Sequence, residues 1–228
     1  MFAVWVNTAA IVVGTLAGLL LRRGISEALS DALMKGLGLC TIVIGMKGSL
    51  QEENILVLTV CIVVGIVIGE TLDWDGHVNR FAERVAARFA GGEGEASKIA
   101  QAFVTSCLIM NVGAMVIVGS LQAGLSHDYA MLYTKSLLDL VSGVMMAAAM
   151  GVGVMGSAVF TLVFQGCIVL LAQFIAPFMS EALIHELSCT GSLMILAIGL
   201  NMIGLTKFKV INFIPALLVV PLAVAIVY

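Results

Sequence analysis

Apolar runs of about 20 residues follow one another along this sequence, separated by charged residues, glycine and proline. A run of this length spans a bilayer as a helix. Of the 228 residues, 61% are hydrophobic and only 11% are charged, and the mean hydropathy is +1.13. Such a chain has too little polar surface to cover a soluble globule. Because the alternating pattern of membrane β-strands is absent, the sequence predicts an all-α, polytopic membrane helix bundle that forms one integral membrane domain.

Eight spans are predicted, and the distribution of basic residues supports that number. If all eight runs cross, nine basic residues fall on one side of the membrane and two, Lys47 and Lys135, on the other. By the positive-inside rule the richer side is cytoplasmic, and both termini lie outside. The first run has neither a basic n-region nor a cleavage site, so we expect it to remain as a span. The spans are residues 2–21, 28–48, 54–72, 99–122, 129–152, 157–176, 182–204 and 210–228; the nine basic residues are Arg22, Arg23, Lys35, Arg80, Arg84, Arg88, Lys98, Lys207 and Lys209.

A long polar segment, residues 73–98, lies between the third and fourth predicted spans. From Val78 to Phe89 its apolar residues recur at helical spacing, opposite basic residues. This pattern predicts an amphipathic helix on the cytoplasmic surface of the membrane, followed by a glycine-containing linker.

The tetrapeptide Ser-Glu-Ala-Leu occurs twice, at residues 26–29 and 180–183. With this offset of 154 residues, eight of 25 positions are identical between residues 26–50 and 180–204. One explanation is local, because serine and glutamate are preferred at the start of any helix.

The other explanation is an internal duplication. Each copy of the tetrapeptide follows one predicted span and precedes two more, which gives a first repeat at residues 1–72, a central two-helix unit at 99–156 and a second repeat at 157–228. In this 3+2+3 arrangement the second repeat starts from the opposite side of the membrane. Inverted repeats of this kind are typical of secondary transporters, and some channels share them.

The fifth predicted span contains two charged residues, Lys135 and Asp139, which share a helix face because they are four residues apart. Asp139 lies roughly 15 Å into the span, near the bilayer centre. Ionisable residues at this depth are costly and mark functional sites. The pair is therefore a candidate substrate or ion site, with Ser136 and Ser142 within a turn of it. The alternative is a structural pair that neutralises itself and joins two helices.

Three further polar residues inside spans are candidates for contact with a substrate or ion. They are Ser106 and Asn111 in the fourth span and Gln165 in the sixth. For the amides, and for Asn201 near the end of the seventh span, the alternative is a hydrogen bond to a neighbouring helix.

Small residues at four-residue spacing predict close contacts between helices. They occur at Ala10, Gly14 and Gly18 in the first span and at Gly65 and Gly69 in the third. We interpret these positions as packing surfaces.

Motifs of enzymes and metal sites are absent from the sequence. The five cysteines lie in or beside apolar runs without CxxC or Cys/His spacing, which predicts neither disulfides nor a metal site. There is no HExxH or GxSxG motif, and the histidines lie in loops or at helix ends. We expect no catalytic residue and no cofactor. The formal net charge of -3 gives no indication of nucleic-acid binding.

Six stretches of the sequence are similar to one bacterial family. They are GLGLCTIVIGMKGSL (36–50), IGETLDWDG (68–76), VGAMVIVGSLQAGL (112–125), KSLLDL (135–140), GVGVMGSA (151–158) and FQG (164–166). In them the chain resembles the YdfK/YqgA-like inner-membrane proteins, domain of unknown function 554, over nearly its whole length. The resemblance implies a multi-pass protein of the bacterial inner membrane. The family's pattern is matched at Gly113, Gly119, Ser120, Lys135, Ser136, Asp139 and Gln165, whereas Asn111 departs from it, since a smaller or thiol side chain is expected there.

Three classes of function stay open on the sequence. The first is a secondary transporter that moves a small polar or anionic metabolite and is coupled to protons or sodium. The second is a passive ion or solute channel built on the same repeat, and the third is a non-transporting assembly or sensory protein that uses the segment 73–97. The expected partners are membrane lipid, a small-molecule or ion substrate and a second copy of the chain, and an enzyme is not expected.

Overall fold

The computed structural model describes residues 1–227 except residues 23, 25, 52–53, 87–92 and 112–113. The described residues form helices, turns and loops, and no strand occurs among them, so the predicted all-α class is confirmed. In chain order the helices are α1 (Phe2–Arg22), α2 (Glu27–Ser49), α3 (Ile55–Thr71), α4 (Trp74–Ala86), α5 (Glu93–Asn111), α6 (Ala114–Leu125), α7 (Ala130–Met150), the 3₁₀ helix η1 (Val152–Val154), α8 (Met155–Leu170), α9 (Ala172–Ile175), η2 (Ala176–Phe178), α10 (Glu181–Met202), η3 (Val210–Phe213) and α11 (Pro215–Val227).

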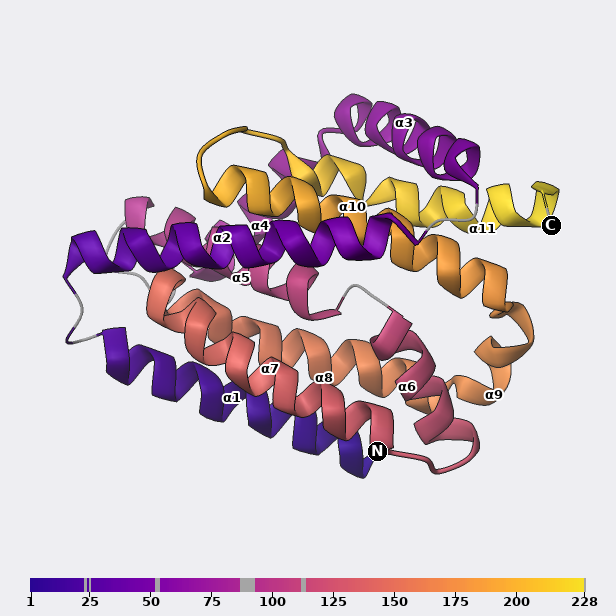
Figure 1. Ribbon diagram of the computed structural model, residues 1–228, viewed down its shortest axis with the longest axis horizontal. Coiled ribbons are helices and arrows are strands. Elements are labelled where there is room, and N and C mark those ends of the chain that lie inside the picture. The colour runs from indigo at the N-terminus through magenta and orange to yellow at the C-terminus, as the bar shows by residue number, and fades with distance from the viewer. Residues whose placement is uncertain (23, 25, 52–53, 87–92, 112–113, 228) are drawn as a thin grey trace.

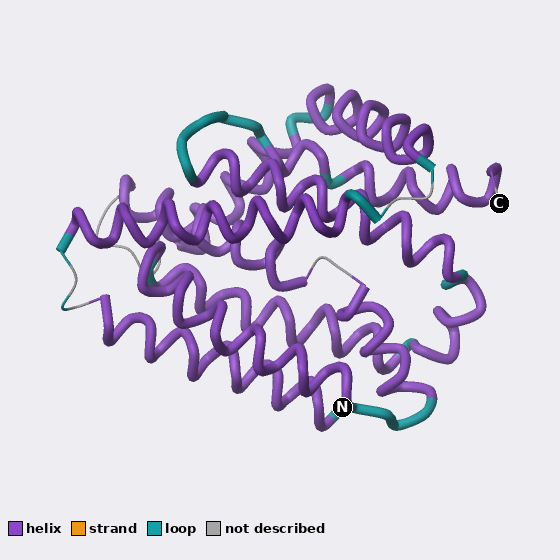
Figure 2. The backbone as a smooth tube through the Cα atoms, viewed as in Figure 1, coloured by secondary structure: helices purple, strands orange, loops and turns teal. Residues whose placement is uncertain are grey.

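The helices are arranged in two groups, with α5 between them (Figure 1). In one group α1 packs along α7 and α8, and in the other α2 packs along α10 while α3 packs along α11. The backbone trace shows that α1 begins, and α11 ends, toward the right-hand end of the view (Figure 2). Long α-helices therefore account for most of the fold, and short loops or single turns connect them.

Five helical segments of the described chain are long and apolar enough to cross a membrane, and the number rises to seven if two bent helix pairs each count as one span. The five are Phe2–Arg22, Asp31–Ser49, Val152–Leu170, Glu181–Met202 and Val210–Val227. The 21-residue helix α7 is not among them, because Lys135 and Asp139 lower its hydropathy. The structure is that of a multi-pass membrane protein, and the count of eight spans stays a prediction.

Two predicted spans differ from the observed helices. In place of one helix over 99–122, α5 begins earlier, at Glu93, and is bent by 62° relative to α6. In place of one helix over 157–176, α8 ends at Leu170, and two short helices follow. Pro177 lies in the second of these, where its missing N–H prevents a continuous α-helix.

The predicted small-residue surfaces lie at close helix contacts. A Cβ atom at Gly14 would clash with the carbonyl oxygen of Leu140, and one at Gly18 would clash with that of Val144. Since the residue numbers rise together, α1 and α7 are parallel. In the same way Gly65 and Gly69 of α3 face the backbone of α11 and η3. Only a residue without a side chain permits such approaches.

Both copies of Ser-Glu-Ala-Leu begin a helix. The hydroxyl oxygen of Ser26 accepts a hydrogen bond from the backbone N–H of Leu29 at 3.3 Å, and that of Ser180 accepts one from Leu183 at 3.1 Å. Each serine thus satisfies one of the N–H groups that a helix start leaves without an internal partner. The capping role of both serines is confirmed, and the choice between local preference and duplication as the origin of the repeated tetrapeptide stays open.

Replacement of the second cap has a measurable consequence. Ser180→Ala is expected to cost about 1 kcal/mol, because the N–H of Leu183 loses its acceptor. For a chain of this size the melting temperature should fall by about 2–4 °C in detergent. Ser180→Asp supplies another acceptor and should retain most of the stability. Equal losses in the two variants would contradict the capping role.

The helices that start with these caps, α2 and α10, are antiparallel and make reciprocal contacts. A Cβ atom at Gly45 would lie 2.6 Å from Cα of Leu196, and one at Gly199 would lie 2.8 Å from the backbone nitrogen of Ile42. The offset of 154 residues that relates the two tetrapeptides also relates Ile42 to Leu196 and Gly45 to Gly199. Each helix therefore uses equivalent positions to contact the other.

Candidate functional site

A buried polar cluster, composed of Asn7, Lys135, Asp139 and Gln165, lies where α1 packs against α7 and α8. Asn7 and Gln165 are fully buried, and Lys135 and Asp139 are 8% and 2% exposed. The surrounding helices are largely apolar, as expected for a membrane bundle. Four polar side chains at one place in such an interior need a structural or functional reason.

Two contacts organise this cluster. The Lys135 ammonium donates to Oδ1 of Asp139 one helical turn further along α7, which confirms that the two side chains share a face. Nδ2 of Asn7 donates to Oε1 of Gln165 at 3.2 Å, joining α1 to α8. The Asn7 amide also faces the Asp139 carboxyl, so the ion pair and the amide pair form one cluster.

Several polar atoms of the cluster have no hydrogen-bond partner among the described residues. They are Oδ2 of Asp139, Oδ1 of Asn7 and Nε2 of Gln165. Oγ1 of Thr161, one helical turn before Gln165, also has no hydrogen-bond partner among the described residues. A buried polar atom without a partner is costly. Carboxylate, amide and hydroxyl oxygens together can bind a proton or a hard cation, and the amide N–H groups can donate to a polar solute.

The other predicted site residues lie at separate positions. Ser136 donates to the carbonyl of Leu132 at 2.7 Å, and Ser142 is half-buried on the same helix. Ser106 donates to the carbonyl of Phe103 at 2.9 Å, and Asn111 donates to that of Cys107 at 3.2 Å. Each of these three hydrogen bonds forms within a single helix, α7 for Ser136 and α5 for Ser106 and Asn111. None of them connects to the side chain of Lys135 or Asp139. Their roles at a binding site stay predictions.

Sequence reasoning missed Asn7. A signal was available, because Asn7 is an amide within the apolar first run, FAVWVNTAAIVV, and the same criterion had selected Asn111. Its contact with Gln165 joins residues that are 158 positions apart, and no local pattern predicts it.

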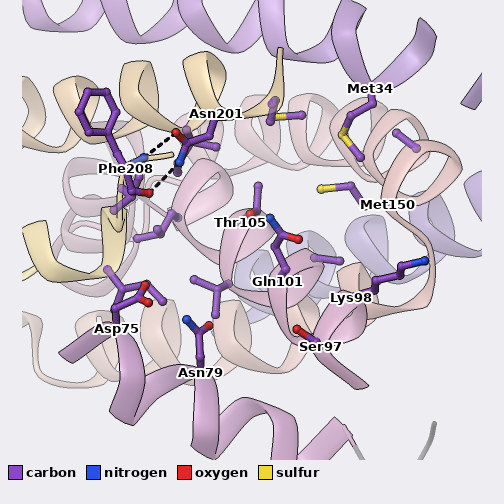
Figure 3. Close-up of a pocket in the computed structure, with 18 of the residues that line it drawn as sticks. Met34, Asp75, Asn79, Ser97, Lys98, Gln101, Thr105, Met150, Asn201 and Phe208 are labelled. Carbon is purple, nitrogen blue, oxygen red and sulfur yellow. Dashed lines mark hydrogen bonds between the residues drawn. The ribbon is translucent and has the colours of Figure 1, made fainter. Parts of the chain in front are cut away.

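A pocket of about 570 Å³ opens at the end of the bundle where α1, α7 and α10 finish (Figure 3). Helix α5 contributes Gln101 and Thr105, four residues apart on one face, and α4 contributes Asp75 and Asn79. Helix α5 also contributes Lys98 and Leu108, and other segments contribute Arg22, Met34, Met150, Asn201 and Phe208. Because so many separate segments contribute, the sequence alone did not reveal this pocket.

Two charged residues of the pocket, Arg22 and Asp75, form hydrogen bonds with neighbouring groups. Arg22 donates from Nη1 to the carbonyl of Ala149 at 3.2 Å, at the end of α7. The backbone N–H of Asp75 donates to Oδ1 of Asn212 at 2.7 Å. Burial raises the pKa of the Asp75 carboxyl, although a hydrogen bond with Asn79 and the ammonium group of Lys209 act in the opposite direction.

Asn201 shapes one wall of the pocket. Its Nδ2 donates to the carbonyl of Phe208 at 2.8 Å, and its Oδ1 accepts from the backbone N–H of Phe208 at 2.9 Å and from Oγ1 of Thr206 at 2.7 Å. The amide thus closes the loop after α10 rather than joining two helices. The sequence left two roles open for Asn201, a contact with substrate and a hydrogen bond to a neighbouring helix. The structure shows a third role, which is to hold the loop that contains Thr206 and Phe208.

A mostly apolar layer separates the pocket from the buried polar cluster. Its core is formed by Ile11, Met110, Met146 and Val154, all at most 1% exposed. Along α1, Ile11 lies between Asn7 of the cluster and Arg22 of the pocket. Along α7, Met146 lies between Asp139 of the cluster and Met150 of the pocket. The pocket and the cluster are therefore two polar regions divided by packed side chains.

Residues 2–225 match the family described as "Protein of unknown function (DUF554)". The chain belongs to the DUF554 family. The resemblance noted in the sequence is thereby confirmed, and the match extends over nearly all of the bundle.

Two relatives of this DUF554 chain cover it almost end to end. The "Uncharacterized membrane protein YdfK" of Bacillus subtilis (strain 168) is 26% identical over 232 residues, which cover 100% of this chain and 97% of the relative. The "Uncharacterized protein YqgA" of Escherichia coli (strain K12) is 25% identical over 224 residues, covering 97% and 95%. No solved structure matches the chain significantly. The name of the Bacillus subtilis relative agrees with a membrane protein, and neither name gives an activity.

Proposed function

We propose that this chain is a secondary transporter of the bacterial inner membrane, which moves a small polar or anionic metabolite together with protons or sodium ions. The observation that carries the proposal is the buried Lys135–Asp139 pair, in which one carboxylate oxygen is paired and the other has no partner among the described residues. A charged side chain inside a membrane bundle is costly unless function requires it. A carboxylate with a free oxygen is suited to bind and release a cation.

The packing of α2 against α10 also supports this proposal. Two antiparallel helices that contact each other through equivalent positions are related by a twofold axis perpendicular to their length. For helices that cross a membrane, such an axis lies in the membrane plane, as in an inverted repeat. Alternating access in many secondary transporters arises from movement between repeats of this kind.

The bend between α5 and α6 and the position of the pocket fit the same mechanism. The pocket opens at the end that carries Arg22 and Lys98, the end predicted to be cytoplasmic. The apolar layer around Met146 closes the path between the pocket and the Asp139 carboxylate. We infer that this conformation is open to one side only, and that transport requires the layer to rearrange.

Reconstituted vesicles test the proposal. Protein in liposomes with an internal pH-sensitive dye is exposed to neutral amino acids, dicarboxylates and sugars, with and without a sodium gradient. We expect saturable, gradient-driven accumulation of one solute class. Asp139→Asn should reduce gradient-driven uptake to the level of empty vesicles, because the amide cannot exchange a proton or neutralise a cation.

The matched control for this variant is Asp31→Asn. Asp31 pairs with Lys35 at 2.7 Å with the same four-residue spacing, but both side chains are exposed. Uptake by this control should equal that of the wild type. Undiminished accumulation in Asp139→Asn would remove the coupling role, and single-channel currents would favour the passive channel instead.

A further inference from the structure

The pocket at the end of the bundle carries charges of both signs that do not neutralise one another. None of the four ion pairs among the described residues includes Arg22, Lys98 or Asp75. Lys209, which attracts Asp75, is itself within 4.0 Å of Glu70. Two cations and one carboxylate therefore face the same space, and none of them forms an ion pair with another described residue of the pocket.

Their placement keeps the two signs apart. Figure 3 shows Asp75 and Asn79 on one side of the pocket and Lys98 on the other, with Gln101 and Thr105 between them. A guanidinium has five N–H donors, and Arg22 uses one of them on Ala149, so further donors are available to a ligand. The pocket thus has a cationic side, a neutral polar middle and an anionic side.

The other lining residues and the volume of the pocket limit the polarity, size and charge of a ligand. Met34, Leu108 and Met150 present apolar surface, while the amides and the hydroxyl between the charges are neutral. A volume of about 570 Å³ lies within the usual range for small-molecule sites. An anion without an ammonium group would be repelled by Asp75, and a simple cation would be repelled by Arg22 and Lys98.

We infer that this pocket binds a small zwitterion whose two charges lie at opposite ends of a short chain, with its carboxylate on Arg22 and Lys98 and its ammonium group on Asp75. This names the substrate class of the proposed transporter and rests on that function. The uncharged body of the ligand lies against Gln101, Thr105 and the apolar wall. The carboxylate of the ligand then compensates the positive charges of the pocket, and its ammonium group compensates the negative charge of Asp75.

The test compares three probes with the same five-carbon chain. 5-Aminopentanoate carries a charge of opposite sign at each end, pentanoate lacks the ammonium group, and pentan-1-amine lacks the carboxylate; 6-aminohexanoate is added as a second zwitterion. Binding to the purified wild-type protein is measured from the rise in melting temperature with probe concentration. We expect a zwitterion to bind at least tenfold more tightly than either single-charge analogue. Stabilisation by neither zwitterion, or equal stabilisation by an analogue, would overturn the inference.

Two variants assign the charges. Asp75→Asn should weaken binding of the zwitterion at least tenfold, because the ammonium contact is lost, and should leave pentanoate bound at least as tightly, because a repelling charge is removed. Lys98→Gln, at an exposed position, should weaken the zwitterion and leave pentan-1-amine bound at least as tightly. Asp31→Asn and Lys35→Gln, exposed on α2, are the matched controls and should bind like the wild type. An equal effect of a pocket variant and its control would overturn the assignment.

The outcome also separates this inference from the proposed transport. Zwitterion binding that requires Asp75 and Lys98, without uptake into vesicles, would retain the pocket and remove the transporter. Coupled uptake of a carboxylate that needs no ammonium group would retain the transporter and remove the zwitterion.

Discussion

Lys135→Met is expected to destabilise the protein by about 3–5 kcal/mol, because it leaves the Asp139 carboxylate buried without its cation. Methionine keeps most of the length of the lysine stem, so lost packing contributes little. Thermal unfolding in detergent can be followed with a thiol-reactive fluorophore. The buried cysteines Cys61, Cys107 and Cys189 become accessible only when the bundle opens.

Two further variants separate charge from packing. In Lys135→Met/Asp139→Leu both charges are gone, and most of the lost stability should return, since apolar residues often replace a buried pair at little cost. Lys35→Met breaks the exposed pair with Asp31 and should cost less than about 1 kcal/mol. A double variant no more stable than Lys135→Met would show that the loss comes from the lysine stem. A stable double variant without coupled uptake would show that the pair serves function rather than folding.

Gly45→Ala is expected to cost about 1–3 kcal/mol, because the added methyl group would lie 2.6 Å from Cα of Leu196 and the two helices would have to separate. Gly199→Ala should cause a similar loss, since it places a methyl group 2.8 Å from the backbone nitrogen of Ile42. The same fluorophore assay measures both.

The matched control on the same helix is Gly36→Ala. Nothing lies within 4 Å of a Cβ atom at Gly36, so alanine should be neutral or add up to about 1 kcal/mol through its higher helix propensity. Losses of similar size at Gly36 and Gly45 would contradict close helix contact as the cause. Very different losses at Gly45 and Gly199 would count against the equivalence of the two helices.

The features that sequence analysis predicted correctly depend on neighbouring residues. The membrane class follows from long apolar runs. The start of α2 at Ser26 and of α10 at Ser180 follows from the capping preference of serine. The pairing of Lys135 with Asp139 follows from their spacing of one helical turn. Each of these patterns lies within a few residues, where propensity and helix geometry decide the outcome.

The features that were missed depend on how the helices pack. The contact of Asn7 with Gln165 joins the first helix to α8, and the pocket combines residues as distant as Arg22 and Phe208. The bend between α5 and α6 divides a run that hydrophobicity alone presents as one helix. Local preference contains no information about which helix faces become neighbours, so these features require the three-dimensional structure.

The apolar layer formed by Ile11, Met110, Met146 and Val154 has an electrical consequence. Water-filled regions conduct, so in an energised membrane most of the voltage falls across the thin part of the protein that excludes water. One elementary charge that crosses the whole membrane voltage exchanges about 2.3 kcal/mol with the membrane for every 100 mV, and a charge that passes this layer exchanges the part of that energy that corresponds to the voltage across the layer. In the proposed transporter, a charge that moves between the pocket and Asp139 has to cross this layer, so its passage would depend on the membrane voltage as well as on packing.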